Sequence, residues 1–303
     1  MNLSEIKEQL YLYTDEDRVT EYEPMDLHTS FRCGGAADLY VVPGTLGELM
    51  NVTDLVRRLK VPYLILGNGS NILFTDGGFH GVVIRVGEGL DRVRIEGQTV
   101  FVEPGVSLAK LAKMAAAEGL TGLEFACGIP GSLGGAVFMN AGAYGHEIKD
   151  VLLSVSSINS LGMMKDRRPE DCRFGYRHSI YMDTDEVILG VKLFLQQGLK
   201  QDIEDAMKDY TQQRNSKQPV NLPSAGSFFK RPEGHFAGRL IEDAGLKGLQ
   251  IGGAQVSPMH AGFIVNTGNA TATDVIDLMH VVQETVMDKF GVFLEPEVRI
   301  VGE

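Results

Sequence analysis

LGNGSNIL, residues 66–73, contains a glycine-rich loop. Apolar residues lie on both sides of its glycine loop: PYLIL (62–66) precedes it, and GVVIRV (81–86) follows shortly after. Both runs are typical of buried strands. A nicotinamide-binding Rossmann fingerprint requires a third glycine and a helix directly after the loop, and this stretch has neither. A short glycine-rich turn can nevertheless present consecutive backbone N–H groups to a pyrophosphate.

The loop therefore predicts a nucleotide-phosphate site formed by Gly67, Asn68, Gly69, Ser70 and Asn71. A second glycine-rich segment, GIPGSLGGA (128–136), could form another wall of that site. For each loop taken alone, a tight turn in which glycine supplies a positive φ is the commoner explanation. Two such loops in one half of the chain favour a dinucleotide, and the strand–loop–strand order favours FAD over NAD. The candidates in the second wall are Gly128, Ile129, Gly131, Ser132, Gly134 and Gly135.

The remaining chain alternates helix and strand signals without a regular repeat. Thr45 with Glu48, and Thr271 with Asp274, form potential capping boxes at the start of two helices. Near residue 199 the pattern changes to an amphipathic helix that Pro219 ends. Parallel and antiparallel strand signals are mixed, so the sequence predicts an α+β protein. A last strand is expected over FLEPEVRIVG, close to the C-terminus.

Composition excludes several classes of protein. The 303 residues carry a net charge of −12, which disfavours nucleic acid as a partner. The sequence has no apolar run long enough to span a membrane and no secretory leader, so a cytoplasmic protein is expected. Three cysteines without a CxxC pair indicate reduced thiols, and seven histidines without HExxH give no support for a metal site. P-loop and GxSxG motifs are also absent.

Several long motifs resemble a known family. HTSFRCGGAADLYVVP (28–43), LGNGSNILF (66–74) and residues 122–145 resemble the FAD-binding domain of the vanillyl-alcohol-oxidase (PCMH) type. FGYRHS (174–179), AGSFFKRP (225–232), residues 244–266 and LEPEVRI (294–300) are similar to the UDP-N-acetylenolpyruvoylglucosamine reductase family, in its shorter form. The resemblance runs from about residue 27 to the C-terminus.

The resemblance implies a PCMH-type domain of two α/β subdomains, followed by a smaller α/β substrate-binding domain. The expected limits are an N-terminal helical segment over 1–26, the FAD domain over 27–198 and the substrate domain over 199–303. It also implies non-covalent FAD, NADPH as co-substrate, and an enolpyruvyl UDP-sugar that is reduced to UDP-N-acetylmuramate for peptidoglycan synthesis. A monomer is expected.

The resemblance further selects three catalytic side chains. Hydride addition to C3 of the enolpyruvyl group leaves an enolate that needs charge stabilisation and a proton at C2. Arg177 offers a planar fork to the carboxylate, although a surface arginine paired with Glu170 or Asp171 is the ordinary alternative. Ser227 is the implied proton donor, although a serine after glycine often bonds only its own turn.

Glu297 is the third implied catalytic residue. Glu295, Glu297 and Arg299 would share one face of the last strand, and spacing does not separate the two carboxylates. The resemblance selects Glu297 and leaves Glu295 as a solvated neighbour. A second carboxylate nearby, or burial near the substrate carboxylate, would raise the pKa of Glu297, and a protonated Glu297 that donates to the enolate is our hypothesis. The substrate-binding candidates are Lys217, Lys230, Arg231 and Arg299, and Arg231 stands where an asparagine is common in the family.

Two other functions stay open at this point. One is a different flavin oxidase or dehydrogenase of a small molecule on the same domain, with His28 or His80 as the residue to which FAD would be attached covalently. The other is a nucleotide-binding module without catalysis.

Overall fold

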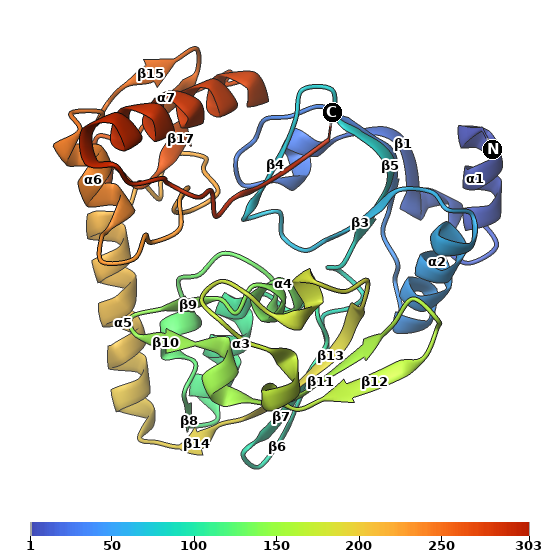
Figure 1. Cartoon of the computed structure of the whole chain (residues 1–303). Coiled ribbons are helices and arrows are strands. Elements are labelled where there is room, and N and C mark those ends of the chain that lie inside the picture. Colours follow the sequence, from blue (N-terminus) through green and yellow to red (C-terminus); the bar gives the residue numbers. More distant parts are fainter. Residues whose placement is uncertain (1, 303) are drawn as a thin grey trace. The chain divides into compact units, whose positions relative to one another are not determined.

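Figure 1 shows the computed structural model, which describes residues 2–302. The chain forms two compact units, and each is assembled from separate segments. The first unit contains residues 2–21, 39–68 and 81–213 of the described chain, and the second contains 22–38, 69–80 and 214–302. The fold is the expected mixture of helices with parallel and antiparallel strands.

A five-stranded antiparallel sheet forms one layer of the first unit, in the order β12-β11-β13-β7-β6. The predicted hairpin is its β6–β7 pair. Valine and leucine side chains of β7 and β13 share a core with the apolar faces of α3 and α4. The bounds are Val93–Glu96 (β6), Thr99–Val102 (β7), Leu108–Ala117 (α3), Leu133–Phe138 (α4), Leu152–Ile158 (β11), Met164–Arg167 (β12) and Val187–Phe194 (β13).

The strands around the first glycine loop belong to a second sheet, with the order β1-β2-β5-β3. Its β3–β5 pair is parallel, and Leu66 lies opposite Arg85 at the ends of the two strands. Helices α1 and α2 pack with this sheet in one apolar core. The bounds are Leu3–Leu10 (α1), Val19–Pro24 (β1), Ala36–Val41 (β2), Leu46–Arg58 (α2), Tyr63–Leu66 (β3) and Phe79–Arg85 (β5). β1, β2 and β5 have residues on both sides of the division between the units.

The cap of α2 differs in one bond from the predicted capping box. Thr45 Oγ1 accepts a hydrogen bond from the N–H of Glu48, as expected. The Glu48 carboxylate accepts from the N–H of Gly44 and the hydroxyl of Thr45, rather than from the N–H of Thr45. Burial alone would raise the pKa of Glu48, but these bonds outweigh it and lower the pKa.

In the second unit, α6 and α7 pack with a small antiparallel sheet, β15-β16-β17 (Figure 1). Thr271 and Asp274 form the predicted capping box of α7. A separate parallel pair joins β18 to β4. The bounds are Ile72–Phe74 (β4), Ala237–Asp243 (α6), Gln250–Ile251 (β15), Ala254–Val256 (β16), Ile264–Asn266 (β17), Ala272–Phe290 (α7) and Arg299–Val301 (β18).

The last strand is shorter than the sequence pattern predicts. β18 begins at Arg299, so Glu295 and Glu297 lie in the extended segment before it and not on the same strand face. Pro296 has no N–H to give to a ladder, which explains why regular pairing starts only after it.

The remaining helix, α5 (Lys200–Lys217), lies where a helix was expected before Pro219. The predicted amphipathic face is weak, because Ile203 is the one buried residue of this helix. The short strands are β8 (Leu120–Thr121), β9 (Gly142–Ala143), β10 (His146–Glu147) and β14 (Gln196–Gln197). Within residues 2–302, no helix has the length and apolar character that a membrane crossing requires.

Candidate functional site

The glycine-rich loops of the first unit gather where β3 and β5 end. Gly67 follows β3, and Val86 follows β5 with its N–H bonded to the carbonyl of Leu66 (2.8 Å). We define the loop cluster as residues 67–68, 85–87, 104–107 and 131–135. In α/β sheets, ligands bind at the carboxyl ends of parallel strands. The first glycine loop therefore begins at an edge that suits a nucleotide.

Close backbone contacts hold the loop cluster together. A Cβ added at Gly67 would lie 2.4 Å from Ser132 Oγ, so a larger residue at position 67 would have to displace this hydroxyl. The N–H of Leu108 donates to the carbonyl of Gly131 (3.0 Å), and the N–H of Gly134 donates to that of Pro104 (2.8 Å). Within this unit the structure thus places Gly67 and Asn68 beside the second predicted wall, residues 128–135.

The other half of the first glycine loop belongs to the second unit. Gly69 has a φ of +61°, and a Cβ there would lie 2.0 Å from the carbonyl oxygen of His28. Asn71 joins this loop to the C-terminal segment. Its side-chain amide donates to the carbonyl of Glu297 (3.1 Å), and its own carbonyl accepts from the N–H of Arg299 (3.1 Å).

The composition of these loops fits a flavin dinucleotide. Neither 67–71 nor 128–135 contains an acidic side chain that would repel a pyrophosphate. Glycine removes the side chains that would cover the backbone N–H groups. A guanidinium, that of Arg85, stands within the loop cluster and donates to Asn68 Oδ1 (3.1 Å). Within the first unit, residues 67–68 and 128–135 would hold the phosphates of the dinucleotide.

The second unit brings Ser227 and Glu297 onto neighbouring backbone segments. The N–H of Glu297 donates to the carbonyl of Phe228 (2.8 Å), and the N–H of Lys230 donates to that of Glu295 (2.8 Å). Phe228 is fully buried, whereas Ser227 is exposed, so the loop anchors its apolar residue and presents its hydroxyl. Gly226 makes this turn with a φ of +80°.

A turn over residues 257–263 supports the other side of the Ser227 segment. The N–H of Phe228 donates to the carbonyl of Gly262 (2.8 Å), and Ser227 forms a bridge with Phe263. His260 Nδ1 accepts from the N–H of Gly262 (3.1 Å), which places the ring proton on Nε2. Burial lowers the pKa of His260 and favours this neutral form.

The cationic candidates of the second unit have distinct surroundings. Lys230 Nζ contacts Glu295 Oε1 at 2.5 Å, so Glu295 is an ion-pair partner as well as an exposed neighbour of Glu297. The Arg231 guanidinium lies 4.5 Å from the centre of the exposed Phe236 ring. Arg299 begins β18, and loss of hydration lowers the pKa of its guanidinium. Lys217 ends α5.

Arg177 lies in the first unit, on a loop with an unusual backbone. Its φ is +53°, a conformation that costs energy for an arginine and commonly marks a functional position. Gly175 and His178 pair across the loop, and Arg177 Nη2 donates to the carbonyl of Gly142 (3.1 Å). Pairing of Arg177 with Asp171 or Glu170, the ordinary alternative to a catalytic role, stays a prediction.

Asn140 anchors that loop and was missed by sequence reasoning. Its amide is fully buried and donates to the carbonyl of Gly175 (2.9 Å) and to Glu147 Oε2 (3.1 Å), while Oδ1 accepts from the N–H of Lys149 (3.3 Å). Its φ of +47° is tolerated by asparagine more readily than by most residues. The sequence signal that could have indicated this role is the position of Asn140 shortly after the glycine-rich segment 128–136.

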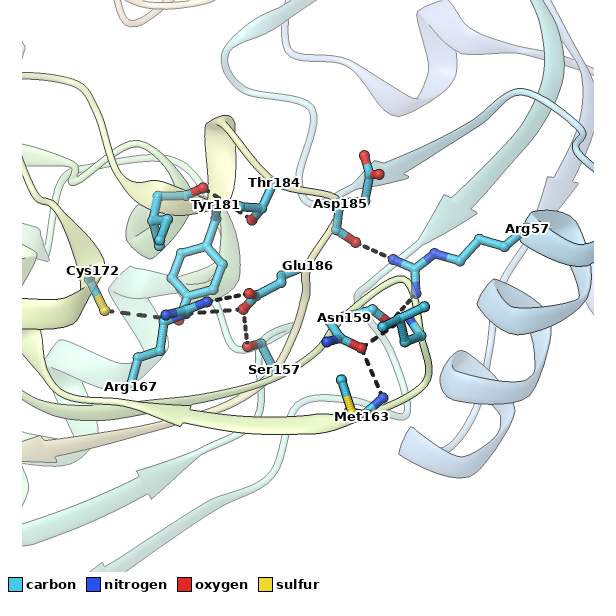
Figure 2. A network of polar contacts seen from close by, with 12 residues as sticks. Arg57, Ser157, Asn159, Met163, Arg167, Cys172, Tyr181, Thr184, Asp185 and Glu186 are labelled. Atoms are coloured by element: carbon cyan, nitrogen blue, oxygen red, sulfur yellow. Dashed lines mark hydrogen bonds and ion pairs between the residues drawn. The ribbon is translucent and has the colours of Figure 1, made fainter.

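Figure 2 shows a partly buried polar network that includes Arg167 and Glu186, the residues on either side of segment 168–185. Arg177 lies within that segment. Arg167 forms an ion pair with Glu186, and Ser157 Oγ donates to the same carboxylate at 2.7 Å. The hydrogen bond from Arg167 is the main reason that the pKa of Glu186 is low. Burial, and then Cys172 beside it, raises the pKa of the neighbouring Tyr181. The ion pair between Arg167 and Glu186 thus joins the two ends of the segment that carries Arg177.

The two histidines considered for covalent FAD face carboxylates. His28 Nε2 lies 2.6 Å from Glu23 Oε1, and His80 Nδ1 lies 3.3 Å from Asp38 Oδ1. Among residues 2–302, no group of three or more metal-ligating side chains is present.

Comparison with known proteins finds a matching family model for each of two parts of the chain. An FAD-binding-domain family model matches residues 37–166, and the model of the UDP-N-acetylenolpyruvoylglucosamine reductase C-terminal domain matches residues 218–301. The reductase of Alkaliphilus oremlandii is 49% identical over 288 residues, which cover 95% of each chain. That of Geobacillus thermodenitrificans is 46% identical over 298 residues, which cover 98% of each.

Solved structures agree with this result. The crystal structure of the reductase from Thermus caldophilus has a TM-score of 0.82 and 36% identity, and the match covers 94% of this chain and 99% of that one. An alkyldihydroxyacetonephosphate synthase, at 16% identity and a TM-score of 0.50, shares the fold over 65% of this chain and 41% of its own. The first part of the chain is thus a PCMH-type FAD-binding domain, as expected. The chain belongs to the UDP-N-acetylenolpyruvoylglucosamine reductase family.

Proposed function

We propose that this protein reduces UDP-N-acetyl-3-O-(1-carboxyvinyl)-glucosamine to UDP-N-acetylmuramate in the cytoplasm, with NADPH as the electron source, for peptidoglycan synthesis. Family membership over nearly the whole chain supports the substrate class. The observation that carries the proposal is the hydrogen bond from the N–H of Glu297 to the carbonyl of Phe228. It holds the segment with the Ser227 hydroxyl next to the segment with the Glu297 carboxyl group. The domain limits at residues 26 and 198 are part of the same proposal.

Arg177, Ser227 and Glu297 would have separate roles in the reaction. Bound FAD supplies the hydride that goes to C3 of the enolpyruvyl group. Arg177 would then neutralise the carboxylate whose negative charge increases as the enolate forms. Ser227 would give its proton to C2, a strongly basic carbon that compensates for the weak acidity of an alcohol. Glu297 in its protonated form would donate to the enolate oxygen.

The cations bind the rest of the substrate. Lys217 and Lys230 would bind the pyrophosphate of the sugar nucleotide as point charges, with Arg231 and Arg299 beside them. The ion pair with Glu295 holds the Lys230 ammonium group in place before the substrate binds. Arg231 would make ionic contacts to the nucleotide rather than the amide contacts of an asparagine.

Replacing Ser227 with alanine tests the reaction directly. Rapid-mixing absorbance of the bound flavin separates its reduction by NADPH from its reoxidation by the enolpyruvyl sugar nucleotide. We expect Ser227→Ala to leave reduction unchanged and to slow reoxidation about 100- to 10,000-fold, the usual contribution of a positioned proton donor.

Ser224→Ala is the matched control, because the backbone carbonyl of Ser224 accepts a hydrogen bond from Ser30 and its side chain has no assigned role. Both half-reactions should stay at the wild-type rate in that variant. Wild-type reoxidation by substrate in Ser227→Ala would contradict the role given to Ser227. A wild-type enzyme that is reduced by NADPH but not reoxidised by this substrate would contradict the proposed reaction itself.

A further inference from the structure

Arg85 occupies a position that the proposed reaction does not use. It is the last residue of β5, directly after three fully buried apolar residues, Val82, Val83 and Ile84. Its strand partner is Leu66, the residue before the first glycine loop. The side chain is partly buried and belongs to the loop cluster. An arginine at the end of an apolar strand, next to a glycine loop, calls for a chemical explanation.

All contacts of the Arg85 guanidinium within the described chain are with neutral groups. Nη2 donates to Asn68 Oδ1 (3.1 Å), Nη1 donates to the carbonyl of Val86 (3.4 Å), and the hydroxyl of Tyr40 is a further partner. Among residues 2–302, no carboxylate oxygen lies within 4.0 Å of it. Burial lowers the pKa of the guanidinium, and Tyr40 offsets only part of this effect. A desolvated cation without a counter-ion is costly, so the site favours an anion.

The contact with Asn68 also orients the glycine loop. Arginine has only donors, so the amide oxygen of Asn68 must face it, and the amide NH2 group then points elsewhere. Arg85 thereby turns the two donors of Asn68 away from itself and leaves them available to a ligand. The same guanidinium retains N–H groups beyond those bound to Asn68, Val86 and Tyr40, because it has five in all.

We propose that Arg85 supplies the positive charge that binds the pyrophosphate of FAD in the loop cluster, and that it fixes Asn68 as a second donor to the same group. The pyrophosphate is the anionic part of the dinucleotide, and a planar guanidinium fork suits phosphate oxygens. The position agrees with the rule for parallel sheets, since Arg85 and Gly67 stand at the carboxyl ends of paired strands. This inference rests on the FAD of the proposed function.

The test compares flavin affinities of apoprotein prepared from the full-length chain. We expect Arg85→Gln to raise the dissociation constant for FAD about 10- to 100-fold, as the loss of a charge-assisted hydrogen bond does. Riboflavin, which has no phosphate, should bind to Arg85→Gln and to wild type within about twofold. Arg85→Lys, which keeps the charge but not the fork, should fall between them. Flavin fluorescence measures all of these constants.

Thermal unfolding provides the second measurement, because Arg85→Gln should affect the melting temperatures of the apoprotein and the FAD-loaded protein differently. Removing a desolvated cation should leave the melting temperature of the Arg85→Gln apoprotein equal to or above that of the wild type. The increase in melting temperature on adding FAD should be smaller in this variant, because weaker binding stabilises less. Arg94→Gln is the matched control: Arg94 is an exposed arginine on β6 that pairs with Glu96.

The proposal fails if Arg85→Gln binds FAD within about twofold of wild type, or if riboflavin affinity falls as much as FAD affinity. A drop in apoprotein melting temperature as large as that of the FAD-loaded protein would assign Arg85 to folding instead. None of these measurements uses the enolpyruvyl substrate. A wild-type enzyme that binds FAD but does not reduce the proposed substrate would therefore leave the role of Arg85 standing.

Discussion

At the scale of single residues, Gly67 shows why glycine is needed in the loop cluster. Its backbone φ is one that other residues adopt readily, so the requirement comes from space rather than from conformation. The nearest atom to an added Cβ is Ser132 Oγ at 2.4 Å, and the next is Ser132 Cβ at 3.6 Å. One hydroxyl oxygen therefore accounts for the clash.

Gly67→Ala should lower the free energy of unfolding by about 1 to 3 kcal/mol, the usual cost of overpacking. In a Ser132→Ala background most of this loss should disappear, because the clashing oxygen is gone. Urea unfolding of the wild type, both single variants and the double variant gives the coupling. Gly69→Ala is the contrast, since its Cβ would meet a backbone oxygen, that of His28, at a φ of +61°. Purely additive effects of Gly67→Ala and Ser132→Ala would show that the contact is not as described.

At the scale of elements, the N-terminus of α7 is fixed by residues from two segments. Thr271 and Asp274 form its capping box, and Asp76 accepts hydrogen bonds from the N–H groups of Ala272 and Thr273 at 2.8 Å each. Burial of Asp76 opposes ionisation, but the bonds from Thr273 and Ala272 outweigh it and lower its pKa. Asp76 thus joins the loop after β4 to a helix far along the chain.

The lowered pKa of Asp76 predicts a definite pH dependence. A carboxyl group whose pKa is lower in the folded state stabilises the fold above its unfolded pKa of about 3.9, and loses this effect as the pH falls through the folded value. Asp76→Asn should therefore cost about 1 kcal/mol at pH 7, a typical capping contribution, and less as the pH drops below about 4. Chemical denaturation at a series of pH values measures this difference.

Asp277→Asn is the control, since Asp277 is exposed on α7 beyond its first turn. Its unfolding free energy should differ from that of wild type by less than about 0.5 kcal/mol at each pH. A difference between Asp76→Asn and wild type that stays constant from pH 7 to pH 3 would contradict the assignment.

Local sequence patterns predicted the elements better than the pairs between them. The cap of α7 was readable because Thr271 and Asp274 are three residues apart. The parallel pairing of β18 with β4 was not, because distant strands leave no joint pattern in the sequence. Within the candidate site, the glycine loops were visible as composition. Arg85 and Asn140 were missed. The role of Arg85 depends on the lack of a nearby carboxylate in the described chain, and that of Asn140 on its hydrogen bonds to Gly175, Glu147 and Lys149, and neither is visible in the sequence.

At the scale of the whole molecule, the charge of the chain bears on its assembly. A net charge of −12 on 303 residues disfavours self-association. We therefore expect a monomer with a mass near 33.0 kDa in light scattering at moderate salt. A mass of about twice that value, stable on dilution, would contradict this expectation.

The pairing of β18 with β4 also has a consequence for biosynthesis. Arg299–Val301 are synthesised long after Ile72–Phe74, yet they complete the edge of that strand, which directly follows the first glycine loop. At about 5 to 20 residues per second, the earlier strand waits roughly 10 to 45 seconds for its partner. During that interval Leu73 and Phe74, fully buried in the finished protein, belong to an unpaired edge in the nascent chain. Translation of this enzyme thus includes a vulnerable period in which chaperone protection would raise its yield.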